Sequence, residues 1–332
     1  MKLGILGTGM IVQYGALPTI EQLNLEYVSI LGVKEFEEQT KELTAKYKLD
    51  RYHLDYNEML DTAIDTVYVA LPNSLHFEFA KKALLKGKNV IIEKPITVNT
   101  RELKELNDLA SEYNLIVIEA MTLNYLPAFH GLKEKLVEIG DPKIVNFNYS
   151  QYSSRYDAFK NGEILPAFDY RKAGGSLMDI NVYNINAIVG LFGAPISFNY
   201  FANIEKQIDT SGVLVLDYGK FKAVAIGAKD CNSPNISTIQ GDKGSIIIEK
   251  PFNSIREFVF KSHTGEPERC TFEQEENKFL YEFREFVRIM DTHDLKKANQ
   301  IMEVSKAVAD ILETARNQQE IVFPSDAELE VR

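Results

Sequence analysis

The first 120 residues alternate between short apolar runs and longer stretches in which apolar residues recur at helical spacing. The apolar runs are rich in Val and Ile and lack polar alternation, which is typical of strands buried on both faces of a parallel sheet. The stretches between them predict helices that flank this sheet. Strands are predicted at 2–6, 26–33, 66–71, 89–92 and 115–118, and helices at 11–20, 35–47, 76–86 and 100–113.

The pattern changes after about residue 121, where strands of alternating polarity carry more aromatic residues. Turn residues separate them, which favours an antiparallel sheet. Strands are predicted at 144–150, 197–204, 213–218, 222–226, 237–240, 245–249 and 257–261, and helices at 127–139, 175–192, 276–290 and 296–316. The sequence therefore predicts an α/β protein. Residues 1–122 are predicted to form a doubly wound Rossmann domain, and residues 123–332 an α+β domain with a mainly antiparallel sheet.

The charge balance narrows the class of partner. The chain of 332 residues has 37 Lys and Arg against 48 Asp and Glu, a formal net charge of −11. Nucleic acids and anionic membranes both attract basic surfaces, so neither is an expected partner. No window holds the roughly 18 apolar residues of a membrane span, and the apolar run at the start is too short for a signal peptide. We therefore expect a cytoplasmic protein.

The cysteines and most histidines show no metal-ligand spacing. Cys231 and Cys270 stand far apart, with no second ligand nearby in sequence. The histidines without such spacing are His53, His130, His263 and His293. We therefore predict no metal and two reduced cysteines.

A glycine-rich turn follows the first predicted strand. Gly7-Thr8-Gly9-Met10-Ile11 joins the strand at 2–6 to the next helix. Gly7 permits a tight turn, Gly9 permits close approach of a pyrophosphate, and the helix N-terminus offers N–H groups to the anion. The position usually taken by a third Gly or Ala holds Val12. These residues predict a dinucleotide site.

The end of the second strand bears on which dinucleotide binds. An acidic residue there commonly binds the ribose hydroxyls of NAD, but this strand ends in Gly32-Val33-Lys34. A lysine can pair with the 2′-phosphate of NADP, or it can be an ordinary surface lysine. The sequence leaves NAD and NADP open and favours NADP.

Two further strand ends carry candidate residues. Leu71-Pro72-Asn73 follows the third strand and leads to His76, and Glu93-Lys94-Pro95 follows the fourth. Because ligands of doubly wound sheets bind at the carboxyl ends of the strands, we expect these residues near the dinucleotide. His76, Glu93 and Lys94 are therefore candidate cofactor contacts, together with Leu71, Pro72 and Asn73.

Taken together, these motifs resemble the Gfo/Idh/MocA oxidoreductases, which include glucose–fructose oxidoreductase and dimeric dihydrodiol dehydrogenase. The resemblance covers almost the whole chain. Its marks are the glycine turn, the Pro-Asn-x-x-His turn at 72–76, Glu-Lys-Pro at 93–95, Glu119-Ala120, the Gly174–Tyr183 segment and the turn at 241–245. The resemblance implies an NAD(P)-dependent dehydrogenase or reductase acting on the CH–OH group of a sugar, polyol or trans-dihydrodiol.

The resemblance also implies catalytic residues, namely Lys94, Asp179 and Tyr183. The i, i+4 spacing of Asp179 and Tyr183 places both on one face of a helix. We hypothesise that Tyr183 is the general acid/base, that Lys94 favours its phenolate, and that Asp179 orients Lys94 or holds a substrate hydroxyl. His76 is expected near the nicotinamide ribose or the substrate. The alternative to this catalytic role is that Tyr183 is only an aromatic residue of the core.

Two segments before the helix predicted at 175–192 are polar and aromatic, as a pocket that binds a polyol would be. Each segment could equally be a solvated loop. Their candidate substrate residues are Arg155, Tyr156, Asp169 and Arg171.

Relatives often dimerise through the second sheet, and Phe198, Tyr200 and Phe201 suggest an exposed aromatic face on it. A homodimer or a higher homo-oligomer is therefore expected, unless the domain's own helices cover that face.

Two other function classes stay open. One is a cofactor-binding regulatory protein without turnover, and the other is a glycosidase that uses NAD transiently.

Overall fold

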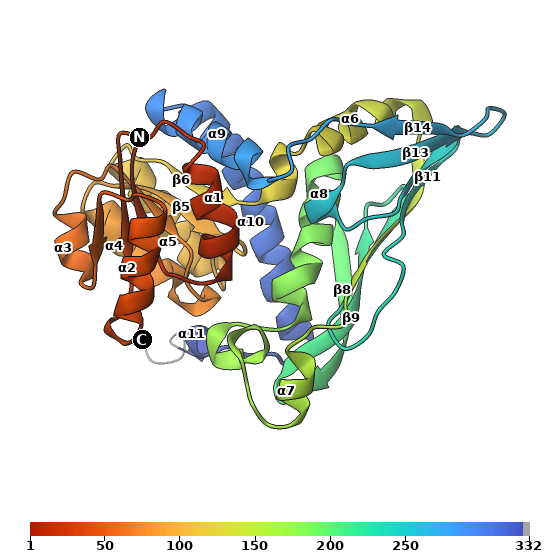
Figure 1. The fold of residues 1–332 in the computed structure, drawn as a ribbon. Helices are drawn as coiled ribbons and strands as arrows, with labels where there is room; N and C mark the ends of the chain where they lie inside the picture. The colour runs from red at the N-terminus through yellow and green to blue at the C-terminus, as the bar shows by residue number, and fades with distance from the viewer. Residues whose placement is uncertain (328–332) are drawn as a thin grey trace. The chain divides into compact units, whose positions relative to one another are not determined.

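The computed structural model describes residues 1–327. They divide into two compact units (Figure 1). The first unit contains Met1–Ala120 and Glu276–Glu303, and the second contains Met121–Glu275 and the residues from Val304 on. Both units are therefore discontinuous in sequence, whereas the sequence analysis assigned one continuous range to each domain.

A six-stranded parallel sheet forms the centre of the first unit, in the order β3-β2-β1-β4-β5-β6. This is the strand order of a doubly wound dinucleotide-binding fold. The central strands are buried on both faces, as their Val- and Ile-rich composition predicts. The strands are β1 (Lys2–Leu6), β2 (Tyr27–Leu31), β3 (Arg51–His53), β4 (Thr66–Val69), β5 (Asn89–Glu93) and β6 (Val117–Ala120).

Helices flank this sheet (Figure 1). α5 shows why they form: Asn99 caps its N-terminus through the N–H of Glu102, and Leu103, Leu106 and Ala110 share its buried face. The helices are η1 (Val12–Ala16), α1 (Leu17–Ile20), η2 (Lys34–Phe36), α2 (Glu37–Lys46), α3 (Tyr56–Leu60), η3 (Asn73–Leu75), α4 (His76–Leu85), α5 (Thr100–Glu112), α9 (Phe279–Asp291) and the first part of α10 (Leu295–Gln318).

Three details of the first unit differ from the sequence prediction. The helix expected at 11–20 begins as a π-helical segment, η1, and continues as α1, which has Pro18 in its first turn. This position suits proline, whose missing N–H has no partner to lose there. β3 and α3 were not predicted, because three and five residues are too short to establish a period.

An eight-stranded sheet forms the centre of the second unit, in the order β14-β13-β12-β11-β7-β10-β9-β8. Every neighbouring pair is antiparallel except β7 and β10, which run parallel. The mainly antiparallel sheet is thus confirmed. The strands are β7 (Pro142–Ser150), β8 (Ser197–Glu205), β9 (Ile208–Asp217), β10 (Lys222–Ala228), β11 (Ser237–Gly241), β12 (Gly244–Ile248), β13 (Glu257–Ser262) and β14 (Glu268–Thr271).

The helices of the second unit include α8, which packs on β10 and β7 (Figure 1). Its sequence is mostly apolar, as expected of a helix buried nearly all round. The helices are η4 (Thr122–Tyr125), α6 (Pro127–Lys135), η5 (Leu136–Ile139), α7 (Tyr156–Lys160), η6 (Pro166–Phe168), η7 (Tyr170–Lys172), η8 (Leu177–Asn181), α8 (Val182–Phe192), η9 (Phe252–Ser254), the second part of α10, and α11 (Pro324–Ala327).

The two faces of the second sheet differ in burial. Phe198 and Tyr200 pair with Leu216 and Leu214 on the buried face. Tyr200 is only 1% exposed, so its assignment to an exposed aromatic face was wrong. Phe201 lies on the opposite face and is 63% exposed. The alternation of side chains along a strand explains the difference, since neighbouring residues point to opposite faces.

No helix within residues 1–327 is both long and apolar enough to cross a membrane.

Candidate functional site

The glycine turn occupies the carboxyl edge of the parallel sheet. The N–H of Gly7 donates to the carbonyl of Leu31, and φ of Gly7 is +101°. A Cβ on Gly7 would lie 2.8 Å from the Ala70 carbonyl oxygen, so both the conformation and the space require glycine. The side chain of Leu71 lies 3.3 Å from the same point. The candidate residues after β1 and β4 therefore meet at one edge.

Gly9 faces open space, because a Cβ there would meet nothing within 4 Å. The helix starts at this residue, whose carbonyl accepts from the N–H groups of Val12 and Gln13. The side chain of Gln13 donates to the Thr8 carbonyl at 2.7 Å and closes the turn. An open glycine at the start of a helix fits a dinucleotide phosphate. Met10 and Ile11 occupy the first positions after it.

Lys34 begins η2, three residues past the end of β2, and is exposed. Its charge reaches Glu37, whose pKa is lowered mainly by a hydrogen bond from Lys41 and in smaller part by Lys34. Lys34 thus lies at the carboxyl edge of the sheet.

His76 is completely buried and joins the two other candidate segments. Its Nε2 lies 2.8 Å from the Leu71 carbonyl oxygen, and its Nδ1 lies 2.9 Å from the Pro95 carbonyl oxygen. Burial lowers the pKa of His76, although both carbonyls oppose the shift. A neutral imidazole donates only one of these two hydrogen bonds at a time. Because the ring lies between the Leu71 and Pro95 carbonyls, it keeps the turn after β4 close to the segment after β5.

The Glu93-Lys94-Pro95 segment is fixed through its backbone, and the Lys94–Pro95 peptide bond is cis. The N–H of Ile96 donates to Glu119 at 3.1 Å, and that of Val98 donates to Glu102 at 3.2 Å. Both carboxylates are buried. Charge-assisted bonds of this kind are the stronger class. They hold the backbone that carries Lys94.

Glu93 is also buried, and it accepts a hydrogen bond from the hydroxyl of Tyr68. Burial raises the pKa of Glu93, against the effects of Tyr68 and Lys94. Lys278, just before α9, also acts electrostatically on Glu93 and Lys94. Burial lowers the pKa of Lys278. The sequence analysis missed this lysine, because it lies 184 residues after Lys94 and no motif marks it.

In the second unit, the segment from Ala173 to Val189 is almost entirely buried. Its partly exposed residues are Asp179, Ile180 and Tyr183. The ring of Tyr183 lies 6.1 Å from that of Tyr149, between centroids. The helix therefore offers a carboxylate and a phenol on a surface that is otherwise closed.

Asp209, on β9, holds the start of this helix. Its Oδ2 accepts from the N–H of Leu177 at 2.6 Å and from the hydroxyl of Tyr200 at 2.7 Å. A Cβ on Gly175 would lie 2.3 Å from Oδ1 of Asp209, and φ of Gly175 is +122°. Glycine is thus required where the helix meets this carboxyl group. Burial raises the pKa of Asp209 to about 6.

Lys229 lies next to Asp179, and sequence reasoning missed it as well. Its ammonium is 2.8 Å from Oδ2 of Asp179, and its side chain is 3% exposed. No motif marks it, since it follows β10, 50 residues after Asp179.

The four candidate substrate residues are held in different ways. The hydroxyl of Tyr156 donates to Glu205 at 2.6 Å, and its ring packs in a buried cluster with Phe159 and Phe168. The hydrogen bond to Glu205 raises the pKa of Tyr156 to about 12. Arg155 immediately precedes Tyr156 and is partly buried.

Asp169 and Arg171 form a bidentate salt bridge. The Nε of Arg171 donates to Oδ1 of Asp169 at 2.9 Å, and its Nη2 donates to Oδ2 at 3.0 Å. Burial acts to raise the pKa of Asp169, and the bonds from Arg171 outweigh it and lower the pKa. The Arg171 side chain is 60% exposed.

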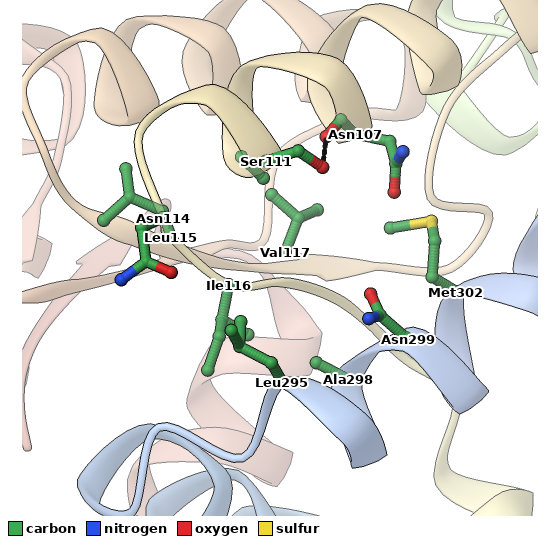
Figure 2. Close-up of a pocket in the computed structure, with 11 residues that line it drawn as sticks. Asn107, Ser111, Asn114, Leu115, Ile116, Val117, Leu295, Ala298, Asn299 and Met302 are labelled. Atoms are coloured by element: carbon green, nitrogen blue, oxygen red, sulfur yellow. Dashed lines mark hydrogen bonds between the residues drawn. The ribbon is translucent and has the colours of Figure 1, made fainter.

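A cavity of about 240 Å³ lies elsewhere in the first unit. Figure 2 shows Asn107, Ser111 and Asn299 around it, with the hydroxyl of Ser111 donating to the Asn107 carbonyl at 2.8 Å. It adjoins the amino end of β6, at the edge of the sheet opposite to Gly7. It contains none of the candidate residues.

Within residues 1–327, no three His, Cys, Asp or Glu side chains are grouped to hold a metal ion.

Known proteins are similar to this chain in sequence and in fold. The family model GFO_IDH_MocA, described as an oxidoreductase family with an NAD-binding Rossmann fold, matches residues 1–121. The chain is 36% identical to scyllo-inositol 2-dehydrogenase (NADP(+)) IolU of Bacillus subtilis, over 87% of this chain and 88% of that protein. The chain belongs to the Gfo/Idh/MocA oxidoreductase family. The resemblance found in the sequence is thereby confirmed.

A further curated protein and a solved structure are also similar to this chain. The trans-1,2-dihydrobenzene-1,2-diol dehydrogenase of Mus musculus is 27% identical over 87% of each chain. The crystal structure of KijD10, a 3-ketoreductase from Actinomadura kijaniata in complex with NADP and TDP-benzene, superposes with a TM-score of 0.84. It covers 96% of this chain and 97% of that one at 21% identity, which shows the shared fold. This Gfo/Idh/MocA protein is an NAD(P)-dependent oxidoreductase that acts on CH–OH groups.

The buried Asp209 predicts a specific pH dependence of stability. Its pKa of about 6 in the folded chain lies above the ordinary value of 3.8. The stability that it contributes is therefore fully present below pH 3.8 and is lost as the pH rises through 6. Asp209→Asn removes this titration and keeps an oxygen for Leu177 and Tyr200.

The measurement is the free energy of unfolding of both proteins at several pH values. From pH 4 to 7, the wild type should lose about 2–3 kcal/mol relative to Asp209→Asn, at about 1.4 kcal/mol per pKa unit. Parallel curves for the two proteins would show that Asp209 does not titrate in this range.

Proposed function

We propose that this oxidoreductase transfers a hydride between nicotinamide and a secondary alcohol or carbonyl of a sugar, polyol or trans-dihydrodiol. The B. subtilis relative is a scyllo-inositol 2-dehydrogenase, and the mouse relative is a trans-1,2-dihydrobenzene-1,2-diol dehydrogenase. The observation that carries the proposal is that Asp179 and Tyr183 are partly exposed polar side chains on an otherwise largely buried helix. They are suited to bind a hydroxyl and to move its proton.

The bound nicotinamide supplies or accepts the hydride. The hydroxyl proton needs a separate acceptor, and Tyr183 is the proposed general acid/base. A phenol is a weak base near neutral pH, so the ammonium of Lys94 is proposed to favour the phenolate. Asp179 is proposed to hold a substrate hydroxyl. Arg155 and Arg171 are proposed as further substrate contacts.

The cofactor is proposed to be NADP. The B. subtilis relative is named as NADP-dependent, and the KijD10 structure contains NADP. In this chain the supporting residue is Lys34, an exposed cation just beyond β2. A cation at this place suits the 2′-phosphate, which NAD lacks.

The assembly is proposed to be a homodimer or a higher homo-oligomer formed through the second sheet. The register places Phe201, Val213 and Ile226 side by side on the open face, and Ile247 lies on the same face beyond β11. Phe201 is 63% exposed, Val213 37% and Ile247 36%. Contiguous exposed apolar side chains mark interaction surfaces. A second copy of the same face would cover them by two-fold symmetry.

The catalytic proposal predicts the effect of one hydroxyl group. Absorbance of the reduced nicotinamide is followed with xylose, glucose, scyllo-inositol and a trans-dihydrodiol, each with NAD and NADP. Tyr183→Phe should lower kcat by about 10²–10⁴-fold, the usual contribution of a positioned acid/base. Tyr149→Phe is the matched control, because its ring lies 6.1 Å from that of Tyr183.

A loss below about tenfold in Tyr183→Phe would reject the acid/base role. Tight binding of the cofactor without turnover of any of the four compounds would favour the regulatory protein. Cleavage of a glycoside with no net change of NAD would favour the glycosidase.

The NADP proposal predicts an effect of Lys34→Ala on one cofactor only. Loss of a charge-assisted bond to the 2′-phosphate should raise the Kd for NADP by about 10–100-fold and leave that for NAD unchanged. Lys46→Ala is the control, since Lys46 is also an exposed lysine but is the last residue of α2, whereas Lys34 precedes that helix. Equal changes for NAD and NADP would show that Lys34 does not bind the 2′-phosphate.

The oligomer proposal predicts that the open sheet face keeps two chains together. Light scattering should give at least twice the 37.7 kDa of one chain for the wild type. Phe201→Lys should give the monomer, because it buries a charge in the interface. Val137→Lys, a change at an exposed apolar residue outside the sheet, should leave the mass unchanged. A monomeric wild type would reject the proposal.

A further inference from the structure

Lys229 is a buried cation beside Asp179, one of the proposed catalytic residues. Its side chain is 3% exposed, and the ammonium has three close neighbours. It lies 2.8 Å from Oδ2 of Asp179, 2.6 Å from the carbonyl oxygen of Ala167, and 4.2 Å from the centre of the Phe168 ring. A buried charge needs such partners, because its loss of hydration is costly.

The pair is asymmetric in exposure, since the Asp179 side chain is 35% exposed. A buried ion pair is in itself weak evidence of a stabilising role. Here a buried cation holds a carboxylate that reaches the surface. Fixing one oxygen of a partly exposed carboxylate removes rotamers that it would otherwise sample. This arrangement is suited to orienting the other oxygen.

The same ammonium connects a second segment to the helix. The carbonyl of Ala167 accepts from Lys229 and, at 3.2 Å, from the N–H of Gly175. A Cβ on Gly174 would lie 2.8 Å from the Ala167 carbonyl carbon, so the absence of a side chain permits this approach. Lys229 therefore bonds to both the η6 segment and Asp179 on η8.

We propose that Lys229 is a positioning residue that holds Asp179 and the η6 segment in the arrangement that substrate binding requires. This inference rests on the proposed function, in which Asp179 binds a substrate hydroxyl. Lys229 is buried, whereas Asp179 reaches the surface, so Lys229 is proposed to act through Asp179 and not to contact the substrate. Without the ammonium, the carboxylate loses its fixed orientation and the nearby cation that favours its ionised form.

Other charged groups lie around Lys229. The ammonium also acts on Asp209. Burial is the main effect that raises the pKa of Asp209, and the charge of Lys229 lowers this pKa in part. Asp230 follows Lys229 directly and accepts from the hydroxyls of Thr210 and Ser211 at 2.8 Å. A test must therefore distinguish the effect of Lys229 on Asp179 from its effect on Asp209.

The first experiment measures kcat and KM of Lys229→Met, which keeps an unbranched side chain and removes the charge. We expect kcat/KM to fall by about 100-fold, the effect of misplacing a reacting or binding group by about 1 Å. In an Asp179→Asn background, Lys229→Met should lower kcat/KM clearly less than in the wild type, since the charge of its partner is already lost and the bond to the Ala167 carbonyl remains to be removed. Lys222→Met is the matched control, because Lys222 lies on β10 and pairs with Asp217 at 2.8 Å on the surface.

The second experiment reads Asp179 without turnover. Aspartate carboxyl carbons are labelled with ¹³C and titrated by NMR in the wild type, Lys229→Met and Lys222→Met. In Lys229→Met the Asp179 midpoint should move to higher pH by about one unit or more, and the acid limb of the kcat/KM profile should move with it. The Asp209→Asn background removes the second carboxyl group and should leave this shift unchanged.

Several outcomes would overturn the proposal. They are an unchanged kcat/KM in Lys229→Met, full additivity with Asp179→Asn, and an Asp179 midpoint that does not move. Where Lys229→Met does not fold, Lys229→Gln, which keeps a hydrogen-bond donor, is measured by the same criteria. The proposed function can fail separately. Absence of turnover in the wild type, or full activity in Tyr183→Phe, rejects that function, while the titration of Asp179 still decides whether Lys229 controls it.

Discussion

Burying a polar group without a partner costs several kcal/mol, roughly 2–7 by transfer measurements. Both units of this oxidoreductase use that constraint to fix the segments that carry its candidate residues. In the first unit the buried ring of His76 and the carboxylate of Glu119 hold the backbone around Lys94. In the second, Asp209 holds the start of the helix that carries Asp179 and Tyr183. These contacts fix the backbone segments from which the candidate side chains project.

The glycines of the family motifs serve the same close packing. Gly7 brings the first turn against the Ala70 carbonyl, and Gly175 brings the helix start against Asp209. Gly174 does the same for the Ala167 backbone. A side chain at any of these positions would push apart two segments that must touch. The motif is thus explained by packing as much as by the cofactor.

The two faces of the second sheet differ in what they contact. One face packs against α8 and so supports Asp179 and Tyr183. The other face carries exposed apolar residues, among them Phe201, and is the face proposed to bind a second chain. The two-residue period of a strand makes this separation possible, because neighbouring side chains point in opposite directions.

The sequence by itself determined the local features: the buried parallel strands, the glycine turn, the helix at 175–192, and the family to which the chain belongs. These depend on residues close together in the chain, where periodicity and turn chemistry act. The candidate residues Lys94, Asp179 and Tyr183 also came from such local motifs, and their catalytic roles remain a prediction.

Tertiary structure alone decided which distant residues support them. Asp209 on β9 acts on the helix from 32 residues away, Lys229 just after β10 acts on Asp179 from 50 residues away, and Lys278 acts on Glu93 from the last part of the chain. It also decided that Tyr200 is buried while Phe201 is exposed, since strand register sets which face is covered. Such partnerships follow from three-dimensional packing, which leaves no period or motif in a single sequence.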